Sequence, residues 1–100
     1  MTHSSRPELF DSLSNRIVAD VQAVNPMLDP IDVEVFFADE LLFASATVRT
    51  ADGGIHWRSS HAATPDSTSI ADLAESGNEL IARITADAQL AAVVNPTRND

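Results

Sequence analysis

The segment TVRTADGGIHWRSSH, residues 47–61, contains the only Trp, two of the three His and two of the six Arg of the chain. His56, Arg58 and Ser60 alternate along a predicted strand, so their side chains share one face. The His and the Ser are four residues apart, over ~13 Å at the rise of a strand. Nucleophilic catalysis needs the base within hydrogen-bond reach of the nucleophile, so this trio does not indicate a catalytic site.

The other candidate ligands and acids do not converge either. His61 comes near the end of the same strand and His3 lies in the N-terminal tail, which is too scattered for a metal site. The acidic run DPIDVEVFFADE, residues 29–40, lacks the oxygen spacing and the glycine of an EF-hand loop. Its acids are more typical of a solvated strand face. We expect no catalytic residue, metal or cofactor.

Composition limits the class of protein. One hundred residues with 44% hydrophobic content predict a single domain over residues 1–100, with tails at 1–4 and 96–100. A net charge of −9 opposes direct binding to nucleic acid or to an anionic membrane and favours basic partners. The absence of Cys excludes a disulfide framework and a thiol nucleophile. The polar N-terminus and the lack of about 18 consecutive apolar residues predict a cytoplasmic protein.

Two amphipathic helices flank the middle of the chain. Ser5 and Glu8 form a capping box before an apolar stripe that repeats every 3.6 residues, and Asn25-Pro26 ends this first helix. Ser69 and Asp72 resemble a second capping pair, and the stripe that follows extends to about Val94. Gly77 interrupts this second helix, which indicates either a close packing contact or a kink.

Between the helices the hydrophobic period changes to two, which is typical of strands. The first strand begins at Ile31, and a reversal at Asp39-Glu40 leads into a second strand over 41–50. If those two acids form the turn, residues at equal distances from the turn pair across the strands. The predicted pairs are Phe37 with Leu42, Phe36 with Phe43, and Val33 with Ala46.

Asp52-Gly53 predicts a type I′ hairpin into a third strand over about 55–62. In that register Val48 lies opposite Trp57 on the core face, while Arg49 faces His56 and Thr47 faces Arg58 on the other face. The predicted fold is therefore α+β with the order α-β-β-β-α, a three-stranded antiparallel meander packed with N- and C-terminal helices. Both helices on one sheet face, or one on each, remain open alternatives.

The same element order occurs in the double-stranded-RNA-binding domain, and the resemblance ends there. That family has a Lys-rich start to its second helix and a His in the loop between its first two strands. Here the corresponding segments read TPDSTSIAD and ADE, which lack the groups needed for phosphate contact. We expect no direct RNA binding by this surface.

The second sheet face combines aromatic side chains, Arg and polar groups, as protein interfaces do. Its candidate partner-binding residues are Phe36, Phe43, Thr47, Arg49, His56 and Arg58. This grouping predicts a non-catalytic, acidic protein-interaction module that self-associates or docks a protein partner through this face. A helix over this face would instead make both Phe ordinary core.

Two alternatives of other classes remain. An acidic inhibitor could mimic nucleic acid and occupy a basic groove of a partner protein. Its candidate surface consists of Asp32, Glu34, Asp39, Glu40, Asp72, Glu75 and Glu79. A small enzyme of unknown reaction would need a pocket in which His56 or His61 lies near a carboxylate.

Overall fold

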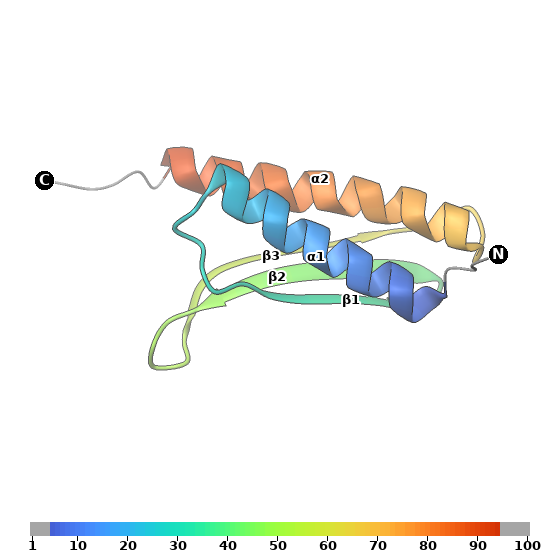
Figure 1. Ribbon diagram of the computed structural model, residues 1–100, viewed down its shortest axis with the longest axis horizontal. Coiled ribbons are helices and arrows are strands. Elements are labelled where there is room, and N and C mark those ends of the chain that lie inside the picture. The colour runs from blue at the N-terminus through green and yellow to red at the C-terminus, as the bar shows by residue number, and fades with distance from the viewer. Residues whose placement is uncertain (1–4, 95–100) are drawn as a thin grey trace, which may run out of the picture.

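A computed structural model describes residues 5–94, which fold into the order predicted from the sequence (Figure 1). The elements are α1 (Arg6–Val24), β1 (Asp32–Ala38), β2 (Leu41–Arg49), β3 (Ile55–Ala63) and α2 (Ile70–Val94). The three strands form one antiparallel sheet in the order β1-β2-β3. The α-β-β-β-α fold is confirmed. The predicted tails at 1–4 and 96–100 lie outside the described residues, as does His3.

Both helices lie side by side on the same face of the sheet, as Figure 1 shows. The central strand supplies the floor of the core through its even-numbered residues Leu42, Ala44, Ala46 and Val48, all of them buried. The helices cover this floor with Leu, Ile and Val side chains from their apolar stripes, and Trp57 packs against the edge of the cluster. No element among residues 5–94 covers the opposite face of the sheet.

The helix caps follow the predicted chemistry closely. Ser5 and Glu8 form a complete capping box at the start of α1, and the backbone N–H of Asn25 closes its last turn. At α2 the Ser69 hydroxyl accepts from the Asp72 N–H, as predicted. The carboxylate of Asp72 differs from the prediction, because it accepts from the Ser67 hydroxyl and leaves the Ser69 N–H to the Ser67 oxygen.

The β1–β2 turn confirms the predicted register. Phe37 pairs with Leu42, Phe36 with Phe43, and Val33 with Ala46. Asp39 and Glu40 have φ angles of 53° and 63°, which are the left-handed values of a type I′ turn. The right-handed strand twist thus imposes this turn on two residues other than Gly.

The β2–β3 hairpin differs from the predicted two-residue turn. The Gly53 N–H donates to the Thr50 carbonyl, the Thr50 N–H donates to the Gly54 carbonyl, and only Gly53 has a positive φ, at 93°. The loop therefore holds three residues, 51–53, because the Asp52 carboxylate accepts from the Thr50 hydroxyl and the Gly54 N–H. These hydrogen bonds, led by that from Thr50, lower the pKa of Asp52.

An extra residue in β3 offsets the extra residue in the loop. Arg49 pairs with Ile55, and the next pair is Val48 with Trp57, so His56 is left over in a bulge. The prediction that Arg49 faces His56 is therefore wrong. The pairs beyond the bulge, including Thr47 with Arg58, are those predicted.

The two helices are in close contact at Gly77. A Cβ atom at this position would lie 2.6 Å from Cδ1 and 2.7 Å from Cδ2 of Leu13, a side chain that is only 2% exposed. Farther along, the buried Asn25 side chain donates to the Ala88 carbonyl, and Arg16 donates to Asn78. The Gly in α2 is thus a close packing contact, and the helix continues through it.

We predict that Gly77→Ala lowers the free energy of unfolding by about 1 kcal/mol. Overpacking a buried site costs ~1–3 kcal/mol, which exceeds the ~1 kcal/mol that Ala gains over Gly in a helix. Urea unfolding measures the change. Ala82→Gly, at an exposed position of α2, calibrates the helix propensity alone. In a Leu13→Ala background the same Gly77→Ala change is expected to be neutral or stabilising, and a stabilised Gly77→Ala single variant would contradict the packing argument.

Candidate functional site

The uncovered face of the sheet carries the odd-numbered side chains of β2 and their cross-strand neighbours. We call it the open face. Three rows of three residues run across it from β1 through β2 to β3. The rows are Asp32, Thr47 and Arg58; Glu34, Ser45 and Ser60; and Phe36, Phe43 and Ala62.

An aromatic pair forms the apolar part of the open face. The rings of Phe36 and Phe43 stack with their centroids 4.9 Å apart and their planes 14° from parallel. Phe36 remains 46% exposed and Phe43 is half-buried. Both helices lie on the other side of the sheet, so neither ring belongs to the core.

Polar groups fill the half of the open face nearer the β2–β3 hairpin. A hollow of about 270 Å³ lies among Asp32, Val33, Glu34, Ser45, Thr47, Arg49 and Arg58. Both Arg side chains are exposed, and neither lies within 4 Å of a carboxylate among residues 5–94. Thr47 is 7% exposed and forms the floor between Asp32 and Arg58. The hollow is therefore acidic along β1 and basic along the other two strands.

The structure brings together most, but not all, of the predicted partner-binding residues. Phe36, Phe43, Thr47 and Arg58 lie in the rows of the open face, and Arg49 extends its polar end. His56 is exposed in the bulge and has no partner across the strand. Its predicted place opposite Arg49 is taken by Ile55, which is 53% exposed.

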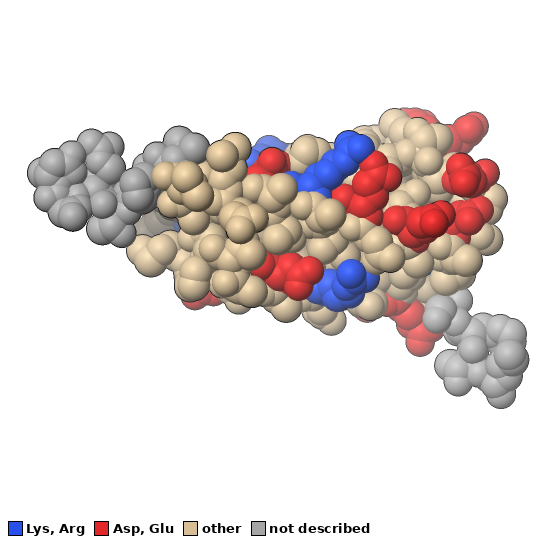
Figure 2. Space-filling view, turned by 90° about the horizontal axis from the view of Figure 1, so that it is seen from above, with Lys and Arg blue, Asp and Glu red and all other residues tan. Residues whose placement is uncertain are grey.

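The seven acids of the alternative prediction do not form one surface. Asp32 and Glu34 lie on β1 in the open face, whereas Asp72, Glu75 and Glu79 belong to α2 on the opposite side of the sheet. Asp39 and Glu40 occupy the β1–β2 turn, at the end of the molecule where α2 begins. Figure 2 looks onto the helices, and acidic side chains gather at that same end.

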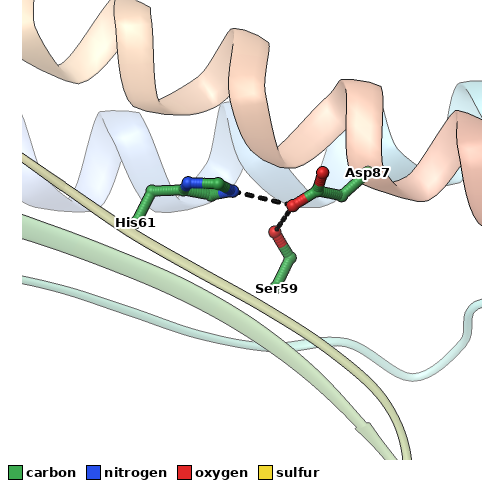
Figure 3. A network of polar contacts seen from close by, with 3 residues as sticks. All are labelled: Ser59, His61 and Asp87. Carbon is green, nitrogen blue, oxygen red and sulfur yellow. Dashed lines mark hydrogen bonds and ion pairs between the residues drawn. The ribbon is translucent and has the colours of Figure 1, made fainter.

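A polar network that the sequence reasoning missed lies between β3 and α2 (Figure 3). The Ser59 hydroxyl donates to Asp87 Oδ2 at 2.7 Å, and His61 Nε2 lies 2.7 Å from the same oxygen. An ionised carboxylate only accepts hydrogen bonds, so Nε2 carries the hydrogen. The hydrogen bond from Ser59, followed by that from His61, lowers the pKa of Asp87.

This network has the residue types of a hydrolytic triad in the wrong order. In such a triad the His lies between the nucleophile and the acid and accepts the hydroxyl proton. Here Asp87 lies between Ser59 and His61, so the hydroxyl donates directly to a carboxylate whose lowered pKa makes it a weak base. Ser59 is also buried. The network ties a strand to a helix and does not activate a nucleophile.

The alternation of side chains along β3 predicts the direction of two of these three residues. Ser59 and His61 lie two and four residues after Trp57, so all three side chains point to the core face, toward a helix. Asp87 is adjacent to Ala88 of the inward stripe, but only the observed placement of α2 over β3 brings Asp87 to Ser59 and His61.

Within residues 5–94 no group of three His, Asp or Glu side chains is arranged to hold a metal ion. None of the helices described is both long and apolar enough to cross a bilayer.

Comparison with known proteins gives one partial similarity. The chain is 40% identical to porphobilinogen deaminase of Leifsonia xyli subsp. xyli over 58 residues. This stretch is 58% of the chain and 18% of that enzyme, so the chain spans less than a fifth of the length of the curated relative it matches. No protein-family model and no solved structure matches the chain.

We predict that Asp87→Asn destabilises the fold at neutral pH and much less in acid. The native pKa of Asp87 lies below its ordinary value of 3.8, so its interactions stabilise the fold above that pH and are lost as the pH falls through the native value. The Asp87 side chain is 44% exposed, which limits the loss at pH 7 to about 1 kcal/mol or less.

Urea unfolding at pH 7 and near pH 3 measures this difference. Asp11→Asn, at an exposed position of α1, is the matched control and is expected to change stability by less than about 0.5 kcal/mol at either pH. A loss that is equal at the two pH values would contradict the ionised Asp87.

Proposed function

We propose that this protein is a non-catalytic interaction module that binds protein through its open face. The observation that carries the proposal is the stacked Phe36–Phe43 pair on a sheet face that neither helix covers. Exposed aromatic side chains surrounded by polar groups favour association, because burying them removes apolar surface from water.

The composition of the open face supports the same proposal. Phe and Arg are enriched at protein interfaces and supply much of the binding energy there. The two Arg side chains end in planar guanidinium groups, which suit carboxylates of a partner. The polar network at Asp87 offers no competing catalytic function, since its Ser is buried and its His does not accept the hydroxyl proton.

The similarity to porphobilinogen deaminase covers 58 residues, which is 18% of that enzyme. A stretch this short carries only part of that relative, so the proposal rests on the open face and not on the similarity.

We predict that Phe43→Glu weakens binding through the open face at least tenfold. A buried aromatic anchor contributes about 2 kcal/mol or more to an interface, and a charge at the same place adds a desolvation cost. The molar mass in solution over a range of concentrations, and the affinity for any protein bound by the unaltered chain, measure the effect.

Leu90→Glu is the matched control, because Leu90 is 59% exposed on α2 and lies away from the open face. It is expected to change the affinity by less than twofold. If Phe43→Glu behaves like Leu90→Glu in mass and in binding, the proposed function is wrong.

A second candidate function is favoured by the gathering of acidic side chains at one end of the molecule (Figure 2). We name the acids of the β1–β2 turn and of the first turns of α2 the acidic end: Asp39, Glu40, Asp72 and Glu75. With a net charge of −9, this end would dock a basic groove of a partner by electrostatic attraction.

We predict that an octa-arginine peptide separates the two functions. Binding at the acidic end is expected to weaken more than tenfold between 50 and 300 mM salt, because screening acts on exposed charges, whereas docking through the aromatic pair changes little. Asp39→Asn with Glu75→Gln removes two charges from the acidic end, and Asp32→Asn with Glu34→Gln removes two from the open face. Equal loss of peptide binding by both pairs would contradict a localised acidic site.

A further inference from the structure

We propose that the partner of the open face is a second copy of this chain, related by a two-fold axis that runs parallel to β2. This inference rests on the proposed function and specifies its occupant. In a face-to-face dimer with this axis, β2 lies over β2 of the partner and each edge strand lies over the opposite edge strand. Every row of the open face therefore meets the same row of the partner with its ends exchanged.

The first row is self-complementary in charge. Its ends are Asp32 on β1 and Arg58 on β3, with Thr47 between them. Exchange of the edges brings each Asp32 to the Arg58 of the other copy, twice per dimer. On the open face β1 carries only acidic charge, through Asp32 and Glu34, and the other two strands carry only Arg49 and Arg58. Asp32 therefore faces Arg58 and Glu34 faces Ser60, while the two exposed Arg49 side chains at the end of β2 come over each other at the axis.

The other two rows are complementary in hydrogen bonding and in size. The second row places the Glu34 carboxylate opposite the Ser60 hydroxyl, an acceptor opposite a donor. The third row places the exposed Phe36 over the small Ala62, while the two Phe43 rings meet at the axis. Large side chains over small ones are what close packing of two sheets requires.

A two-fold axis perpendicular to the strands lacks these properties. It would place β1 over β1 running in the opposite direction, so that an axis through the middle row puts Glu34 opposite Glu34 and Asp32 opposite the ring of Phe36. Like charges placed opposite each other oppose association. The charges of β1 and β3 thus favour the axis parallel to β2, which pairs each Asp32 with an Arg58.

The size of the open face sets the expected strength of the dimer. Three strands at ~4.8 Å spacing and about nine residues at ~3.3 Å per residue give a footprint of about 400 Å². A standard interface buries about 800 Å² of accessible surface on each partner. We therefore expect a dimer that dissociates in the micromolar range or above.

Charge exchange between two variants tests the arrangement. Asp32→Arg places Arg opposite Arg58, and Arg58→Asp places Asp opposite Asp32, so each variant alone is expected to dimerise about tenfold more weakly than the unaltered chain. An equimolar mixture of the two variants restores both opposite-charge contacts. Native mass spectrometry, which resolves the three dimer masses, is expected to show the heterodimer in excess over both homodimers.

Two further variants control for total charge. The double variant Asp32→Arg with Arg58→Asp keeps the net charge of −9 and is expected to dimerise within about threefold of the unaltered chain. Asp11→Arg changes the net charge as Asp32→Arg does, but at an exposed position of α1, and is expected to leave the dimer unchanged. Circular dichroism confirms the fold of each variant.

Sedimentation equilibrium of the unaltered chain tests the second copy as the occupant separately from the proposed function. A monomer at all concentrations up to about 1 mM overturns the second copy as the occupant, while binding of another protein that Phe43→Glu abolishes would leave the proposed function standing. A dimer without preferential heterodimer formation in the mixture overturns the axis parallel to β2. If Phe43→Glu changes neither self-association nor the binding of any other protein, the proposed function is wrong as well.

Discussion

The alternation of side chains along β2 is the constraint on which the rest of the structure depends. Successive residues of a strand point to opposite faces, and the even-numbered residues of β2 are Leu, Ala, Ala and Val, all buried beneath the helices. Ala44, Ala46 and Val48 have small side chains, so two helices can approach the sheet closely on that side. The odd-numbered residues are thereby directed to the open face, whatever they are.

Most of the fold follows from local patterns in the sequence, because those patterns are set by neighbouring residues. The capping box at Ser5, the change of period after Asn25 and the pairing of Phe36 with Phe43 all depend on residues a few positions apart. The placement of both helices on one face depends on packing between distant segments. Gly77 is the one residue in the sequence that points to this helix packing, because its missing side chain leaves room for Leu13.

In the candidate site, too, some residues follow from local patterns and others depend on the packing of distant segments. Parity alone assigns Phe43, Thr47 and Arg58 to one face, and their neighbours across the sheet follow from the turn at Asp39-Glu40. The network of Ser59, His61 and Asp87 needs the position of α2 over β3, which no pattern within either element specifies. The predicted position of His56 is wrong because the hydrogen bonds of Asp52 lengthen the hairpin loop by one residue, an effect of the Thr50 and Asp52 side chains and the Gly54 N–H acting together.

The bulge at His56 gives this sheet a point at which the chain can change length. The loop is one residue longer than a tight turn and the bulge holds one residue more than its opposing strand, so the two irregularities compensate within six residues of chain. Loss of the residue in the bulge would restore a regular ladder and keep the guanidinium of Arg58 outward and the indole of Trp57 inward. Loss of any residue later in β3 would exchange the inner and outer sides of everything after it. Position 56 is therefore where a shortened hairpin can be accommodated without turning the strand inside out.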